Sequence, residues 1–147
     1  MRTETTSRAS HVRGVRLFQL RTVRDDIRGH LTVGEFALEL PFVPLRYFLT
    51  YSIPSSLTRG EHAHYKCAQF LVCVAGSCTL MVDDGQTREE FRLEEPSCGV
   101  YVPPLVWAAE FEHTADSALL VFASHPYDPE DYIRDYSEFR MLASPQI

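Results

Sequence analysis

The chain has 147 residues, of which 45% are hydrophobic and 23% are charged, and this composition is typical of one globular domain with a buried core. Its formal net charge of -6 at pH 7 excludes a surface that attracts nucleic acid or anionic membrane as a whole. No stretch is apolar enough to span a bilayer, and the N-terminal segment lacks the apolar core of a signal peptide. We therefore expect a soluble, cytoplasmic protein with no nucleic-acid partner and no membrane partner.

Four cysteines, Cys67, Cys73, Cys78 and Cys98, lie among small or apolar residues and form no CxxC pair. A metal or disulfide set is one interpretation of them. We favour buried free thiols, which suit a reducing compartment.

Residues 1–13 are polar and without periodicity, so they predict a flexible tail ahead of a single domain over residues 14–147. Short β segments separated by turn residues then follow, at 15–20, 31–40, 46–53, 69–75, 78–82, 87–93, 100–102, 106–111 and 118–123. The alternation in 31–40 slips at Gly34 and indicates a β-bulge, and the Asp84-Gly85 pair indicates a hairpin. Many short strands with no helix between them predict an all-β antiparallel sandwich or barrel.

A short C-terminal helix is the exception to this pattern. Asp128 resembles an N-cap residue, and Pro129 would occupy the first helical position. Aromatic and apolar residues then recur at helical spacing, at Tyr132, Ile133, Tyr136 and Phe139. They could form a stacking platform for a base, but we favour a helix that packs its apolar side on the barrel.

The histidines of the run Arg59-Gly60-Glu61-His62-Ala63-His64 are two residues apart on a strand, so both imidazoles face the same side. Together with Gln69 and Gly76, they reproduce most of the spacing of the first cupin motif, G-x5-H-x-H-x3-4-E-x6-G. The stretch Pro103–Ala108 stands at the place of the second cupin motif, P-x-G-x-x-H. We therefore expect a cupin-type antiparallel β-barrel, or jelly roll.

The metal ligands of that fold are incomplete in this chain. Gln69 stands at the glutamate position, and Ala108 stands at the third histidine position. Two imidazoles and a neutral carboxamide would bind a divalent transition metal weakly. We therefore expect no metal and no other cofactor, and we interpret His62 and His64 as proton-transfer groups.

Three arginines, Arg28, Arg46 and Arg59, fall at strand ends near the expected site. Each could be an ordinary surface residue, but arginine binds phosphate with two parallel hydrogen bonds. With the rings of Tyr101 and Trp107, they predict a site for a sugar nucleotide.

Several stretches together resemble one known family, the dTDP-4-keto-6-deoxyglucose 3,4-ketoisomerases of deoxysugar biosynthesis. The similarity covers nearly the whole chain beyond its first residues and is most specific in the RGEHAH run and in the DYIRDY run near the C-terminus. The similar stretches are 26–31, 59–64, 69–78, 83–85, 99–107 and 127–136.

This resemblance implies a metal-free homodimer, with N-terminal strands exchanged between subunits, that acts on a dTDP-linked 4-keto-6-deoxyhexose. It implies that the histidine pair moves a proton from C3 to C4 through an enediol, and we expect His62 to be the carbon base and His64 its partner. Family members commonly carry a tyrosine where this chain has Phe48. The resemblance also places Arg28 and Ala108 near C4 of the sugar, where the product configuration is set.

Three alternatives remain open. A related 3,5-epimerase normally uses a His–Asp pair and a tyrosine acid, and the HxH run fits it less well. A metal-dependent cupin oxygenase would require tight iron binding. A non-catalytic sugar-binding cupin would bind the ligand without isomerising it.

Overall fold

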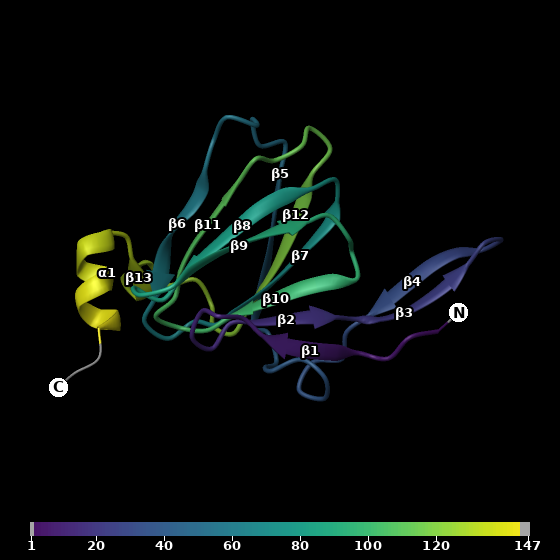
Figure 1. Ribbon diagram of the computed structural model, residues 1–147, viewed down its shortest axis with the longest axis horizontal. Coiled ribbons are helices and arrows are strands. Elements are labelled where there is room, and N and C mark those ends of the chain that lie inside the picture. The colour runs from purple at the N-terminus through teal and green to yellow at the C-terminus, as the bar shows by residue number, and fades with distance from the viewer. Residues whose placement is uncertain (1, 145–147) are drawn as a thin grey trace.

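Two antiparallel sheets face each other and form the body of the protein, as the computed structural model of residues 2–144 shows (Figure 1). The first sheet has the strand order β1-β2-β10-β7-β12-β5. Its strands are β1 (Thr6–Ala9), β2 (Arg16–Gln19), β5 (Arg46–Tyr51), β7 (Gln69–Ala75), β10 (Cys98–Val102) and β12 (Ala118–Ala123).

The second sheet has the order β13-β6-β11-β8-β9, so the strand with the two histidines lies near one edge. Its strands are β6 (Arg59–His64), β8 (Cys78–Asp83), β9 (Arg88–Leu93), β11 (Trp107–Phe111) and β13 (Tyr132–Ile133). The two sheets pack as a jelly roll and do not close into one continuous barrel. The predicted all-β antiparallel class is confirmed, and the predicted hairpin is confirmed as the turn between β8 and β9.

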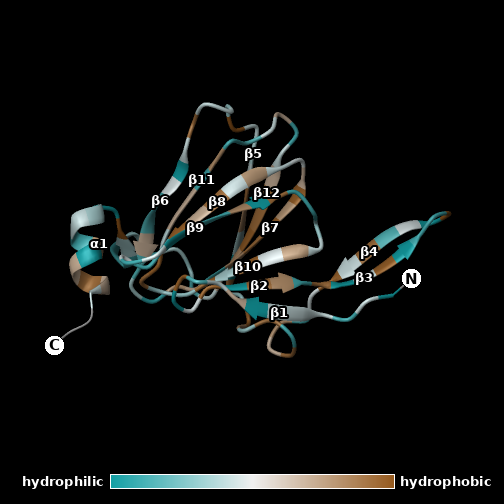
Figure 2. Cartoon of the chain, viewed as in Figure 1, coloured by the Kyte–Doolittle hydropathy of each residue, from teal (hydrophilic) through white to brown (hydrophobic). Residues whose placement is uncertain are grey.

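The main core lies between the sheets, because alternate residues of each strand point inward. Leu71, Leu80 and Val121 belong to this core. A second apolar cluster, with Trp107, Ile133 and Phe139, lies between the outer face of the β6–β11–β8 sheet and helix α1 (Tyr136–Ala143). A third cluster covers the outer face of the other sheet. Hydrophobic stretches therefore concentrate in the central strands, as Figure 2 shows.

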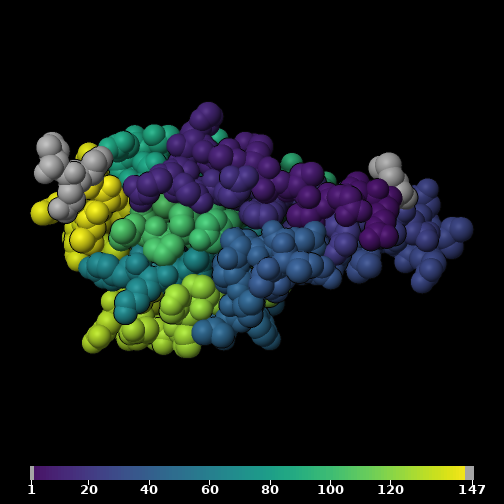
Figure 3. Space-filling model, turned by 90° about the horizontal axis from the view of Figure 1, so that it is seen from below, coloured from purple at the N-terminus to yellow at the C-terminus, as the bar shows by residue number. Residues whose placement is uncertain are grey.

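A separate hairpin of β3 (Arg21–Asp25) and β4 (Gly29–Val33) projects from the body at the end opposite α1 (Figures 1 and 3). Its side chains include exposed apolar residues: Val23 is 39% exposed, Leu31 62% and Ile27, at the tip, 95%. Such a stripe normally meets another surface.

The N-terminal segment differs from the expected flexible tail. Residues 6–9 form β1, which pairs along its whole length with β2, and Val12 is buried in the main core. The segment is polar because β1 is an exposed edge strand that uses backbone hydrogen bonds rather than side-chain burial. Residue 1 of the expected tail and residues 145–147 of the expected domain lie outside the described residues.

The predicted strand over 31–40 is wrong beyond Val33. Residues 34–40 form a loop in which Ala37 has a positive φ of 64°, and the side chain of Leu40 folds back against Gly34. The apolar residues that suggested a strand, Phe36 and Leu40, instead cover the outer face of the first sheet.

The C-terminal helix exists but begins later than predicted. Asp128 caps only a single 3-10 turn, Pro129–Asp131, after which the chain forms β13. The helix α1 starts at Tyr136, and the side chain of Asp135 accepts from the Glu138 amide as its N-cap. Within residues 2–144, no helix is long and apolar enough to cross a bilayer.

Candidate active site

Strand β6 presents His62 and His64 to the space between the sheets. Ala63, between them, packs in the outer cluster below α1, so alternation turns both imidazoles inward. Gly60 and Glu61 have positive φ values of 82° and 59°, and the pairing of β6 with β11 shifts register beside them. This bulge interrupts the regular pairing of β6 with β11 just before the histidines and sets the direction in which they point.

The two imidazole rings meet edge to face, with centroids 5.0 Å apart. Nδ1 of His62 lies 3.0 Å from the carbonyl oxygen of Gly60, and Nδ1 of His64 lies 3.2 Å from Oδ2 of Asp131. Because these oxygens only accept, each Nδ1 donates its proton. Each Nε2 is therefore left with a lone pair that can take up a proton.

Both histidines are held neutral. Burial lowers the pKa of His62, and Arg134 lowers it further, against the hydrogen bond to Gly60. Burial and the neighbouring His62 lower the pKa of His64 to about 4, although Asp131 acts in the opposite direction. An imidazole that is neutral at pH 7 is ready to act as a base.

Four further predicted residues lie with the histidines on the inner faces. Gln69 is buried, and its Nε2 lies 3.5 Å from Nε2 of His64. Ala108 is directly opposite His62 in the pairing of β11 with β6. Arg46 is close enough for its charge to act on His64, and its guanidinium lies 5.5 Å from the centre of the Phe48 ring.

The segment after the 3-10 turn completes this group, and the sequence interpretation missed its role. The ring of Tyr132 lies 4.4 Å from that of His64 and 4.8 Å from that of His62, centre to centre. The guanidinium of Arg134 lies over the Tyr132 ring at 4.4 Å. Tyr132 and Arg134 belong to the DYIRDY run that the sequence interpretation singled out. The helical spacing of the aromatic residues there predicted only packing against the barrel.

Two predicted aromatic residues lie on outer faces instead. Trp107 is buried beneath α1, with its ring 5.2 Å from that of Tyr136, because Ala108, next in the strand, points inward. Tyr101 lies on the outer face of the other sheet, 6.1 Å from the ring of Phe42. Strand alternation therefore places neither ring beside the histidines of its own chain, and their role in substrate binding stays a prediction.

Two predicted arginines are also separate from the pair. Arg59, at the start of β6, is paired with Glu110, and its charge acts on that carboxyl group, whose pKa burial raises to about 7. Arg28 lies in the turn of the projecting β3–β4 hairpin, where its backbone amide donates to Asp25. Within one chain the hairpin extends away from strand β6 (Figure 1).

One trio of side chains in the described residues could hold a metal ion. The ligand atoms of His64, Cys67 and Asp131 lie within 4.8 Å of one another. This trio is not the cupin ligand set, because it would use the Nδ1 side of His64, which faces Asp131. Within the protein, Nδ1 of His64 already donates to Asp131, and Sγ of Cys67 donates to the carbonyl oxygen of Ala68.

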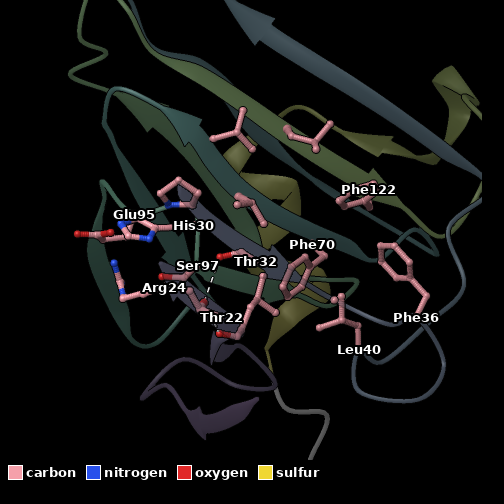
Figure 4. Close-up of a pocket in the computed structure, with 16 residues that line it drawn as sticks. Thr22, Arg24, His30, Thr32, Phe36, Leu40, Phe70, Glu95, Ser97 and Phe122 are labelled. Carbon is pink, nitrogen blue, oxygen red and sulfur yellow. Dashed lines mark hydrogen bonds between the residues drawn. The ribbon is translucent and has the colours of Figure 1, made fainter. Parts of the chain in front are cut away.

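A separate hollow of about 430 Å³ lies outside the histidine site (Figure 4). Its floor is apolar, with Phe36, Phe70 and Phe122, and its rim is polar, with Arg24 and His30 from the β3–β4 hairpin. It therefore lies between the base of the hairpin and the outer face of the first sheet.

Comparison with known proteins places this geometry in a family. Residues 13–144 match the family described as FdtA: WxcM-like, C-terminal. The chain is 39% identical over 115 residues to the TDP-4-oxo-6-deoxy-alpha-D-glucose-3,4-oxoisomerase of Aneurinibacillus thermoaerophilus, covering 78% of this chain and 83% of that protein.

Solved structures agree with the sequence match. A variant of the 3,4-ketoisomerase QdtA from Thermoanaerobacterium thermosaccharolyticum, in complex with TDP-4-keto-6-deoxyglucose, has a TM-score of 0.86 and 34% identity over 90% of this chain and 95% of its own. The TDP-quinovose 3,4-ketoisomerase WlaRB of Campylobacter jejuni has a TM-score of 0.83 and 33% identity over 88% and 99% of the two chains. The chain therefore belongs to the sugar-nucleotide 3,4-ketoisomerase family.

Proposed function

We propose that this isomerase converts dTDP-4-keto-6-deoxyglucose to a dTDP-3-keto-6-deoxyhexose in deoxysugar biosynthesis. The observation that supports the proposal most strongly is the inward-facing pair His62 and His64, in which each Nδ1 donates to the protein and each Nε2 is an acceptor. Related 3,4-ketoisomerases that are 33–39% identical to this chain support the same reaction.

The reaction needs only proton transfers. The C4 carbonyl acidifies the C3–H bond, so His62 can take the C3 proton while the electron pair forms the C3–C4 double bond. A proton moves from O3 to O4, and the C3 carbonyl then forms as C4 takes the proton back from His62. No atom or electron is gained, so no cofactor is required.

Cationic side chains near the histidines suit the pyrophosphate of the substrate. Arg46 and Arg134 both act electrostatically on the histidine pair. Guanidinium groups remain charged when partly buried and match phosphate oxygens. Arg59 stays a candidate for the same role, with Gln69 and Ala108 beside the sugar.

The active form is proposed to be a homodimer in which each hairpin reaches the partner subunit. Arg28 is separated from the histidines of its own chain, while Val23, Ile27 and Leu31 leave the hairpin with an exposed apolar stripe. A second copy would cover that stripe and bring Arg28 to the partner's histidines. The outer-face hollow beside the hairpin offers an apolar surface for the same contact (Figure 4).

A reducing compartment suits the cysteines, and we propose that the protein works in the cytoplasm. Cys67, Cys73 and Cys78 are buried free thiols, and Cys98 is partly exposed. Free thiols persist where glutathione and thioredoxin keep them reduced.

Incubation with dTDP-4-keto-6-deoxyglucose in D2O, with EDTA present, tests the proposed function. We expect a 3-keto product by NMR, with deuterium exchange at the reacting carbons and no need for metal. Absence of both product and exchange would falsify the isomerase proposal. Activity that disappears with EDTA and returns with one added metal would instead support a metal enzyme.

Substitution of each histidine tests the proton-transfer role. We expect His62→Asn and His64→Asn each to lower kcat by at least roughly 100-fold, because a positioned general base contributes about that much. His11→Asn is the matched control, because His11 is exposed and lies outside the site. Near-normal kcat in both site variants would remove the histidines from the mechanism.

A further inference from the structure

The side chain of Asp131 accepts hydrogen bonds from His64 and from two backbone amides that follow His64 in the sequence. This side chain is 10% exposed. Oδ2 accepts from Nδ1 of His64 at 3.2 Å and from the Cys67 amide at 3.1 Å, while Oδ1 accepts from the Lys66 amide at 2.8 Å. The carboxylate is thus fixed by two backbone amides, and the imidazole is fixed by the carboxylate.

The other side of the His64 ring is also constrained. With the proton on Nδ1, Nε2 is an acceptor, and the side-chain amide of Gln69 donates to it at 3.5 Å. The ring of Tyr132, centred 4.4 Å away, packs against the imidazole. A 180° rotation of the ring about the Cβ–Cγ bond would place carbon Cδ2 where Nδ1 now lies and would remove the hydrogen bond to Asp131, so the present orientation is favoured.

His62 is held differently. Its Nδ1 donates to the backbone carbonyl of Gly60 and not to a side chain. A neutral carbonyl orients the ring but cannot compensate a full positive charge as a carboxylate does. The two histidines therefore differ in how well each is supported when it carries a second proton.

We propose that Asp131 is a positioning residue that fixes His64 as the Nδ1–H tautomer, so that its Nε2 faces the substrate as an acceptor. This inference rests on the proposed isomerase function.

Nitrogen-15 NMR of the histidine rings measures the tautomer directly. We expect wild-type His64 to show a protonated Nδ1 and an unprotonated Nε2, with His62→Asn and His64→Asn used to assign the signals. A wild-type His64 protonated on Nε2 would overturn the proposal without recourse to any variant of Asp131.

Asp131→Asn then separates positioning from simple stabilisation. Asn cannot accept on both sides, so it must oppose an amide donor to either Lys66 or the pair of Cys67 and His64. We expect a mixed or reversed His64 tautomer and a kcat at least roughly 100-fold lower with a small change in KM, because a wrong tautomer disables a general base.

Asp128→Asn is the matched control, because Asp128 caps the same 3-10 turn by accepting from the Glu130 amide and has no hydrogen bond to His64. It should keep the tautomer and kcat of the wild type. If Asp131→Asn lowers only the melting temperature, with the His64 tautomer and kcat unchanged, Asp131 is a loop anchor and the proposal is wrong. If the wild type lacks isomerase activity, the proposed function fails, while the nitrogen shifts still decide the tautomer.

Discussion

Burial of His64 couples the chemistry of the site to the stability of the fold. Its side chain is 6% exposed and is packed between Asp131 and the ring of Tyr132. Burial disfavours the charged imidazole more than Asp131 favours it, which is why the pKa falls to about 4. The same enclosure that readies a neutral base therefore makes the protein sensitive to acid.

Stability should fall as the pH drops from about 6.5 towards 4. In that window the unfolded chain binds a proton at His64 and the folded chain does not, and integration of this difference gives a loss on the order of 3 kcal/mol. Urea unfolding across this range checks it. His64→Gln should flatten the curve, and His11→Gln, at an exposed position, should leave it unchanged; equal slopes in all three proteins would contradict the assignment.

Strand alternation decides which parts of each element reach the site. In β11 it turns Ala108 inward towards His62 and Trp107 outward to α1. Helix α1 is therefore not a ligand platform but a cover that packs Phe139 and Ile133 against Trp107. Strand β13 comes shortly before α1 in the chain, and its Ile133 packs in the same cluster as Phe139, so the position of β13 depends on the helix being formed.

Loss of the α1 N-cap should loosen this cover. Asp135→Ala removes the acceptor of the Glu138 amide, and a lost cap costs about 1 kcal/mol. Thermal unfolding should show a melting temperature several degrees lower, roughly 2–6 °C for a chain of this size. Asp135→Asn retains a capping oxygen and should stay close to wild type; an equal loss in both variants would point to charge and not to capping.

At the scale of the whole molecule, the β3–β4 hairpin leaves the body and carries Arg28 with it (Figure 3). If each site is built from two chains, two inactive variants can restore activity when they form a mixed dimer, whereas a site within one chain cannot be restored in this way. Co-expression of Arg28→Ala with His62→Asn should restore about a quarter of wild-type activity, because half of randomly paired dimers hold one intact site. Each variant alone should be nearly inactive.

The control for this complementation pairs Arg46→Ala with His62→Asn. Both residues lie on the inner faces of the same chain, so mixed dimers contain no intact site. Recovery in this control, or none in the Arg28 mixture, would contradict the exchange of hairpins. Analytical ultracentrifugation gives the oligomeric state independently.

Much of the fold and part of the site could be predicted from local patterns. The HxH spacing predicts two histidines on one face, and the inward pair follows from it. The alternation rule also implied that Trp107 and Ala108 face opposite ways, although both were predicted in the site. Asp131 and Tyr132 were missed because helical spacing is a local pattern, whereas β13 pairs with β6 far away in sequence and Asp131 lies 67 residues from its partner His64.

The place of β13 beside β6 also decides when the protein becomes able to work. Residues 131–134 follow strands β1 to β12 in the chain, and they carry the carboxylate and the ring that hold His64. A chain still on the ribosome can therefore pair its long strands while its histidines remain unsupported. A chain that ended before residue 131 would contain both histidines but lack the carboxylate and the ring that hold His64.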